Sequence, residues 1–310
     1  MTDWVSAINQ FFDELRLDED EDDESCTTHR EDIKSAVDAF LADSEKSDRA
    51  LDVYRLFFQA YWMGVGQEEN PFLQLVASLR TFESSAGRII PKHRDHFEHV
   101  VNVFLLGLSF FSANPKYRRL FDDYIRRTGY QDAYKLRHEE FFYRWGLATL
   151  FHDIAYPIEL TQKQAKAYVQ LLTSYVCDGT QEEMVLFNVP GFTQLHDIPL
   201  LQPKECFETK FYENYPLWKT EPFADKVEVL LGSHVAKCMG LVSSEVIREL
   251  EKNKASISTA GFVDHGYYGA VTLLKWSHRL VQNAGWHPSY LYYPILDSAS
   301  AILLHNWYKH

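Results

Sequence analysis

The stretch FFYRWGLATLFHDIAYP, residues 141–157, is an apolar helix pattern that carries His152 and Asp153 side by side. Its apolar residues lie nearly all round the helix axis, which is typical of a central helix in an α-helical domain. Pro157 is expected to end this helix, which would place the His-Asp pair in its last turns. Burial of two adjacent ionisable side chains without a partner is costly. The pair must therefore lie on a solvent-exposed side of the helix or be compensated by an opposite charge.

Helical spacing of apolar residues recurs through most of the remaining sequence, and strand-like alternation is scarce. A second pattern, DHFEHVVNVFLLGLSFF at residues 95–111, is also apolar on nearly every side. The chain has 310 residues, of which 46% are apolar and 15% aromatic, enough for a sizeable core. We therefore predict an all-α fold, a helical bundle with an irregular insertion and an N-terminal helical extension.

Composition also predicts the domain organisation. Residues 4–16 form an amphipathic helix pattern followed by an acidic block, so 1–30 is predicted to be a helix and a solvated linker. This helix is a candidate docking element for a protein partner. Residues 31–310 are predicted to form one helical domain. Five prolines between residues 185 and 222 indicate an irregular insertion, placed at about 161–260.

Charge and cysteine content narrow the functional class. The net charge of −13 argues against broad binding to nucleic acids or anionic membranes, because both require a positive surface. The four cysteines form no CxxC pair, which indicates reduced thiols rather than a disulfide framework or a zinc knuckle. Neither a secretory leader nor a long uncharged apolar run is present, so we expect a cytoplasmic protein without a membrane span.

Histidines interrupt the apolar helix patterns at a few positions. His96 and His99 share one stripe of the helix at 95–111, because residues three apart lie on one helix face. A single such histidine is usually a core residue bonded to a carbonyl group. Several of them on core helices, together with an aspartate, instead predict a site for a divalent cation. The candidate ligands are His99, His152, Asp153, His265 and His305.

The sequence around His265 is suited to close helix packing. Asp264 is a suitable N-cap for a helix that begins at His265. Gly266 and Gly269 would let another helix approach closely, because glycine has no Cβ.

Four short motifs resemble the ordered signature of the HD-domain metal-dependent phosphohydrolases. They are FEHVVNV at 97–103, FHDIAYP at 151–157, HGYYGA at 265–270 and AILLHN at 301–306. In this resemblance His99, rather than His96, stands at the first ligand position. The resemblance spans about residues 93–306 and implies an HD-like helical fold, with core segments 93–160 and 262–310.

The resemblance also implies a centre of one or two divalent transition metal ions, bridged by Asp153 and by a water or hydroxide. One ion would be held by His99, His152 and Asp153, and the other by His265 and His305. Mn, Fe, Ni, Co, Zn and Mg are not distinguished by such donors. The family usually adds an Asp on a helix after the last histidine, whereas Asp297 precedes His305 here. The chain stops at His310 within a helical pattern, so that ligand lies beyond a truncated end, or the site binds one metal, or it is inactive.

The implied reaction is hydrolysis of a nucleotide or a related phosphate ester by a metal-activated hydroxide, with Asp153 at the centre. His96 would bond a phosphate oxygen or orient a metal ligand, and a packed or solvent-facing His96 is the alternative. Arg94 and Lys92 would pair with substrate phosphates, with ordinary surface charge as the alternative. Asp95 would support a ligand histidine.

Two other functions stay open at this point. One is a catalytically weak or inactive HD-like domain that binds a metal or a nucleotide and regulates or contacts a partner. The other is a helical scaffold in which every histidine is structural. The remaining histidines in the same regions belong to no motif and are predicted to be structural: His138, His234, His278 and His287.

Overall fold

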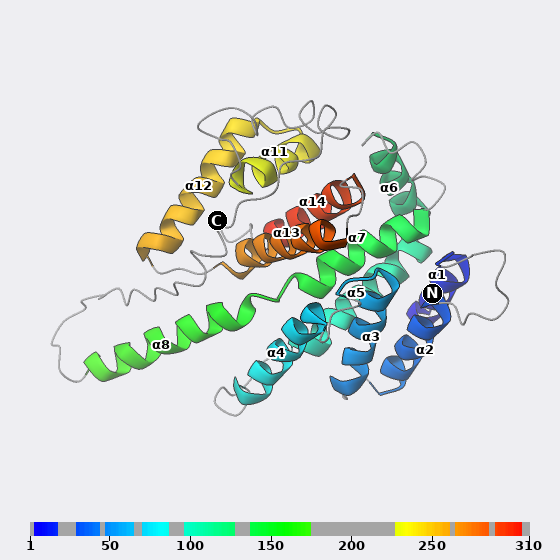
Figure 1. Ribbon diagram of the computed structural model, residues 1–310, viewed down its shortest axis with the longest axis horizontal. Coiled ribbons are helices and arrows are strands. Elements are labelled where there is room, and N and C mark those ends of the chain that lie inside the picture. Colours follow the sequence, from blue (N-terminus) through cyan, green and yellow to red (C-terminus); the bar gives the residue numbers. More distant parts are fainter. Residues whose placement is uncertain are drawn as a thin grey trace. The chain divides into compact units, whose positions relative to one another are not determined.

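The computed structural model describes residues 3–17, 29–43, 47–64, 70–86, 96–127, 137–174, 227–260, 264–284 and 289–305. Every element in these ranges is a helix, which confirms the predicted all-α class (Figure 1). The chain divides into two compact units, Met1–Ile154 and Ala155–His310. The division follows directly after the His-Asp pair, at a place where the sequence predicted no boundary.

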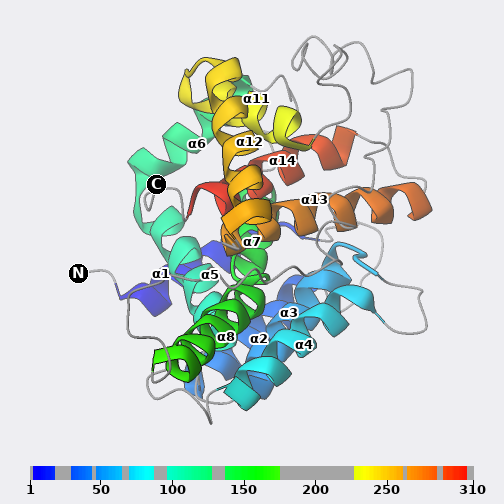
Figure 2. The same cartoon turned by 90° about the vertical axis from the view of Figure 1, so that its left-hand side faces the viewer.

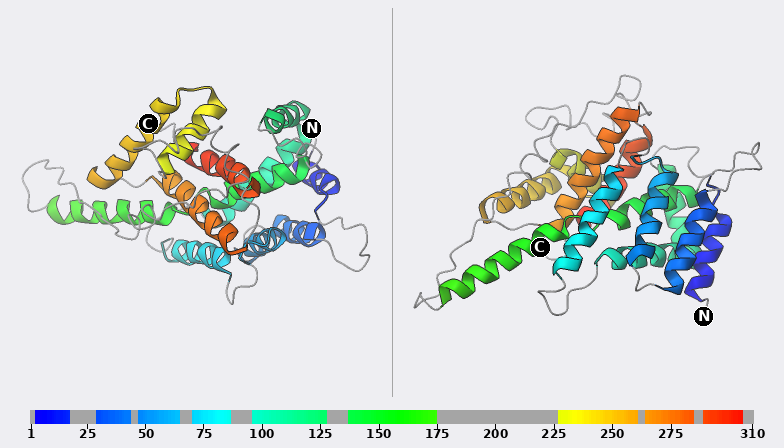
Figure 3. Two further views of the ribbon diagram at one scale, coloured as in Figure 1. Left: turned by 45° about the horizontal axis from the view of Figure 1, so that its top comes forward. Right: turned by 60° about the horizontal axis from the view of Figure 1, so that its bottom comes forward.

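Unit 1 is a bundle of aromatic-rich helices. Its elements are α1 (Trp4–Glu14), α2 (His29–Ala42), α3 (Ser47–Ala60), α4 (Pro71–Ala86), α5 (His96–Ala113), α6 (Pro115–Arg127) and α7 (Arg137–Phe151). Helices that follow each other along the chain, such as α2 and α3, lie side by side (Figure 1, and the right-hand view of Figure 3). Helix α5 is central, because it contacts α1, α3, α4, α6 and α7.

The N-terminal helix α1 belongs to this core. Phe11 is fully buried, and its ring centroid lies 5.8 Å from that of Phe111 on α5 and 6.0 Å from that of Phe142 on α7. Ile8 and Phe12 are buried as well. Apart from Trp4, which is 44% exposed, the apolar stripe expected to dock on a partner is therefore covered by unit 1 itself, and a partner for residues 1–30 stays a prediction.

Helices α5 and α7 approach closely at a glycine. A Cβ on Gly107 would stand 1.9 Å from the indole nitrogen of Trp145, well inside van der Waals contact. That nitrogen donates a hydrogen bond of 2.9 Å to the backbone oxygen of Phe104. Gly107 thus lets the indole lie against the α5 backbone, which fixes α7 against α5.

Of the described helices, α5 alone is long and apolar enough to cross a membrane. More than half of it is buried inside the protein, however. That burial is typical of a core helix, since a lipid-facing helix would leave its apolar side chains outside the protein. The structure is therefore compatible with the expectation that the chain spans no membrane.

The helix at the quoted stretch ends earlier than predicted. Helix α7 stops at Phe151, and His152 and Asp153 lie in the turn that follows rather than in its last turns. Pro157 does not end this helix but stands second in the next one, α8 (Tyr156–Ser174). Proline is tolerated in the first turn of a helix because its missing N–H would have no intrahelical partner there.

Unit 2 contains α8, α11 (Val227–Met239), α12 (Ser243–Ala260), α13 (His265–Ala284) and α14 (Ser289–Leu304). Helices α13 and α14 lie side by side (Figure 2). Asp264 caps α13 as expected, because its Oδ1 accepts hydrogen bonds from the backbone N–H groups of Gly266 and Tyr267. A Cβ on Gly266 would stand 3.0 Å from a carbonyl oxygen of α14, so this glycine does permit close approach.

The insertion predicted at about 161–260 is described only at its ends. Helix α8 continues to Ser174, and α11 and α12 occupy most of Val227–Ala260. The proline-rich segment 185–222 lies outside the described residues, as do Lys92, Arg94, Asp95 and His287.

Candidate metal centres

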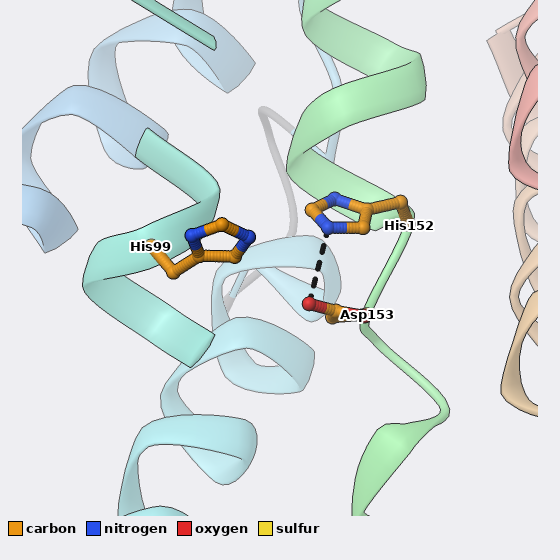
Figure 4. A group of neighbouring side chains, drawn as sticks. All are labelled: His99, His152 and Asp153. Atoms are coloured by element: carbon orange, nitrogen blue, oxygen red, sulfur yellow. Dashed lines mark ion pairs between the residues drawn. The ribbon is translucent and has the colours of Figure 1, made fainter. Parts of the chain in front are cut away.

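Three of the predicted ligands converge within unit 1. His99 lies one turn into α5, while His152 and Asp153 stand directly after α7. One ligand atom from each lies within 4.8 Å of the other two. The imidazoles of His99 and His152 face each other with centroids 5.9 Å apart, and the Asp153 carboxylate lies beside them (Figure 4). Asp153 is buried and both histidines are partly buried.

The orientation of His152 leaves a ring nitrogen for a cation. Its Nδ1 lies 2.7 Å from the backbone oxygen of Thr149. A carbonyl oxygen can only accept, so Nδ1 carries the proton and a neutral ring presents the lone pair of Nε2. This Nε2 lies 3.1 Å from Oδ2 of Asp153, an acceptor facing an acceptor (Figure 4). Such a contact is favourable only when a positive charge, either a proton or a metal ion, lies between or beside the two atoms.

A buried glutamate holds the start of α5 and therefore the position of His99, which lies one turn further along this helix. Glu83 on α4 accepts hydrogen bonds from the backbone N–H groups of His96, at 3.0 Å, and Phe97, at 2.8 Å. These are the first two residues of α5, where the N–H groups have no intrahelical partner and the helix dipole favours negative charge. His99 follows one turn later. Glu83 thus holds the end of the helix that carries this ligand.

His96 is placed by the same glutamate. Its Nδ1 lies 3.1 Å from Oε1 of Glu83, and its ring centroid lies 6.4 Å from that of His99. The contact with a carboxylate on α4 adds an orienting partner that the sequence did not predict. A role for His96 towards a phosphate oxygen stays a prediction.

The two later histidines converge within unit 2. His265 begins α13 and His305 follows α14, and their Nε2 atoms are 2.9 Å apart. His305 contacts the backbone oxygen of Ile302 through Nδ1. His265 contacts the carboxylate of Glu159, on α8, through its own Nδ1. Both Nδ1 atoms therefore face acceptors and carry protons, so the two Nε2 atoms would face each other as acceptors unless a proton or a metal ion lies between them.

This pair fits a cation by distance as well as by charge. Metal–nitrogen bonds are about 2.0–2.1 Å long, so two imidazoles at neighbouring corners of an octahedral ion stand about 2.9 Å apart. The Nε2–Nε2 distance matches that edge, and it equally suits an N–H···N hydrogen bond when one of the two nitrogens is protonated. Each ring also has an acceptor behind it, which is how metal-binding histidines are usually oriented.

The sequence pattern did not predict a role for Glu159. Its side chain is 5% exposed, and it also contacts Lys163 one turn along α8. Burial disfavours the charge of the Glu159 carboxylate, but hydrogen bonds from His265 and Lys163 outweigh burial and lower its pKa to about 2. Glu159 is therefore a carboxylate that holds the His265 ring and raises its basicity. Its only signal in the sequence is an acidic residue just after Pro157.

The structure thus brings the predicted ligands together in two groups, one in each unit. His99, His152 and Asp153 form the first group, and His265 and His305, supported by Glu159, form the pair in the second. Both offer donors that can hold a metal ion. A two-metal centre bridged by Asp153 stays a prediction.

No family model, no curated protein and no solved structure matches this chain. The resemblance to HD-domain phosphohydrolases accordingly rests on four short motifs and on the donor groups that they form.

Proposed function

We propose that the chain is a metal-dependent phosphohydrolase that acts on a nucleotide or a related small phosphate ester. The observation that carries the proposal is the convergence of His99, His152 and Asp153, with the His152 ring turned so that Nε2 faces the carboxylate. The helical fold and the order of the four motifs support it. The paired imidazoles of unit 2 offer a second group of donors for a divalent cation.

A divalent cation in such a group supplies Lewis acidity towards a phosphoryl oxygen and lowers the pKa of a bound water towards neutrality. The residues have separate tasks around it. His99 and His152 offer neutral nitrogens, and Asp153 offers a negative charge that partly balances the charge of the cation. The backbone oxygen of Thr149 holds the His152 ring in one tautomer. Glu83 holds the start of α5 and thereby positions His99.

The test compares Asp153→Ala with Asp38→Ala, the same change at an exposed position of α2. Each protein is purified, its metal content is measured by elemental analysis, and hydrolysis is assayed with Mn²⁺ on nucleotides and on a generic phosphodiester. We expect the wild type and Asp38→Ala to hold metal and to hydrolyse at least one phosphate ester. Asp153→Ala is expected to lose turnover and to hold less metal than the wild type, because the group at His99 and His152 loses a donor, while its circular dichroism stays helical.

The outcomes separate the open functions. Metal in the wild type without turnover of any phosphate ester would overturn the phosphohydrolase and leave a metal- or nucleotide-binding regulatory domain. Full activity in Asp153→Ala would exclude the proposed centre. If the wild type holds no metal after reconstitution, the remaining interpretation is a helical scaffold in which the histidines are structural.

A further inference from the structure

A separate group of metal-type donors lies wholly within unit 2. His234 and Cys238 stand one turn apart on one face of α11, and Asp297 comes from α14, which α11 contacts. One ligand atom from each lies within 4.8 Å of the other two. None of these residues belongs to the motifs considered above, and the sequence predicted His234 to be structural.

The three donor atoms converge on one point rather than forming a relay. Nε2 of His234 lies 2.7 Å from Oδ1 of Asp297 and 3.6 Å from Sγ of Cys238. In a nucleophile–histidine–carboxylate relay the thiol and the carboxylate contact opposite ring nitrogens. Here both contact the same nitrogen, which excludes a relay and is compatible with ligands around a shared cation as well as with a proton on Nε2.

The spacing suits a tetrahedral zinc ion. With zinc–nitrogen bonds of about 2.0–2.1 Å and a zinc–sulfur bond of about 2.3 Å, a tetrahedral edge between nitrogen and sulfur is about 3.6 Å. The observed distance from Nε2 to Sγ equals that edge. The Nε2–Oδ1 distance is a hydrogen-bond length, and it has to open by about 0.6 Å to reach the corresponding edge. Binding of zinc therefore requires a small rotation of the Asp297 side chain.

Burial and charge also favour a cation that accepts sulfur. The side chain of His234 is 3% exposed and that of Asp297 is 11% exposed, whereas Cys238 is exposed to solvent. A thiolate and a carboxylate together carry two negative charges, which Zn²⁺ balances. Thiolate and imidazole donors select zinc over magnesium or calcium. The exposed side at Cys238 gives the ion a path of entry and leaves a fourth position for water.

We propose that His234, Cys238 and Asp297 bind one zinc ion that joins α11 to α14. The bound zinc ion would restrict the movement of α14 relative to α11. Asp297 lies about two helical turns before His305, so an ion fixed to Asp297 holds the helix that leads to that histidine. This site is independent of the proposed phosphohydrolase activity.

The experiment uses cobalt as a spectroscopic substitute for zinc in the full-length chain. A thiolate bound to Co²⁺ gives an intense sulfur-to-cobalt charge-transfer band in the near ultraviolet, which imidazole and carboxylate ligands do not give. The group at His99 and the pair at His265 contain no sulfur, so binding there does not produce the band. The variants are Cys238→Ser and Asp297→Asn, and the matched control is Cys206→Ser, the same change at another cysteine.

We expect the band in the wild type and in Cys206→Ser, its loss in Cys238→Ser and its weakening in Asp297→Asn. Titration with Zn²⁺ should abolish it and should slow alkylation of Cys238 in the wild type, read by mass spectrometry. A wild type without the band, or a Cys238→Ser protein that keeps it, overturns the site. Circular dichroism of each variant verifies that lost binding does not reflect lost folding.

Discussion

The buried carboxylate of Glu83 offers the sharpest test of how the fold positions the first donor group. Its two oxygens accept separate hydrogen bonds from the backbone N–H groups of His96 and Phe97. Replacement by glutamine keeps the shape but leaves one oxygen, and it turns an NH₂ group towards a backbone N–H. We therefore expect Glu83→Gln to destabilise unit 1, with the start of α5 as the weakened place.

The size of the effect follows from the two bonds. A hydrogen bond to a charged acceptor contributes about 1.5–3 kcal/mol and a neutral one about 1 kcal/mol. One bond is lost and the other becomes neutral, so the free energy of unfolding should fall by about 3 kcal/mol. For a unit of this length that corresponds to a drop in Tm of about 6–12 °C. Metal affinity of the group at His99 should weaken with it.

Urea denaturation followed by circular dichroism measures the change, and Glu31→Gln provides the control. Glu31 is an exposed residue in the first turn of α2, so its loss of charge should alter stability by less than about 0.5 kcal/mol. If the denaturation midpoint of Glu83→Gln equals that of the wild type, the carboxylate does not hold α5 and the account of His99 positioning is wrong.

Two further predictions concern unit 2. Gly266→Ala places a Cβ 3.1 Å from Cε1 of His305, so the affinity of the pair His265 and His305 for a metal ion should fall. Gly240→Ala is the control: its Cβ meets no atom within 4 Å, so it should leave that affinity unchanged and, because φ is +67°, lower the stability by about 1 kcal/mol. Isothermal titration with Mn²⁺ separates the two variants, and equal affinities would contradict the close contact. Burial, and then the Lys275 ammonium, lower the pKa of His278 to about 4. Because the unfolded chain binds this proton at about pH 6.5, stability should fall as the pH drops from 6.5 towards 4, by up to about 1.4 kcal/mol per pH unit. His278→Gln should reduce this pH dependence of the free energy of unfolding, measured by urea denaturation at several pH values. An unchanged pH dependence would show that the pKa of His278 is not lowered in the folded protein.

Local patterns in the sequence predicted the helices and the first donor group well, for a physical reason. Apolar spacing determines which faces are buried, so the central helices around Phe104 and Phe142 could be read directly. The pair His152-Asp153 was visible because two ionisable neighbours in an apolar stretch need compensation. Pro157 was misread because the same residue ends one helix or begins another, and spacing alone does not distinguish the two.

The contacts that complete each group were hidden because they join distant parts of the chain. Glu159 meets His265 across 106 residues, and His234 meets Asp297 across 63. No periodicity relates positions so far apart. His234 and Cys238 did share a helix face in the sequence, but two donors without a third indicate little. The third donor, Asp297, became apparent only from the packing of α11 on α14.

The imidazoles of His152, His265 and His305 differ in how easily a mutation can remove the hydrogen-bond partner that orients them. His152 and His305 are steadied by main-chain oxygens, which persist whatever side chain replaces Thr149 or Ile302. His265 depends on the side chain of Glu159, which a single codon change removes. Tuning of this chemistry by mutation should therefore be easier at Glu159 than at the supports of His152 and His305, because Glu159 acts through its side chain and they act through the backbone.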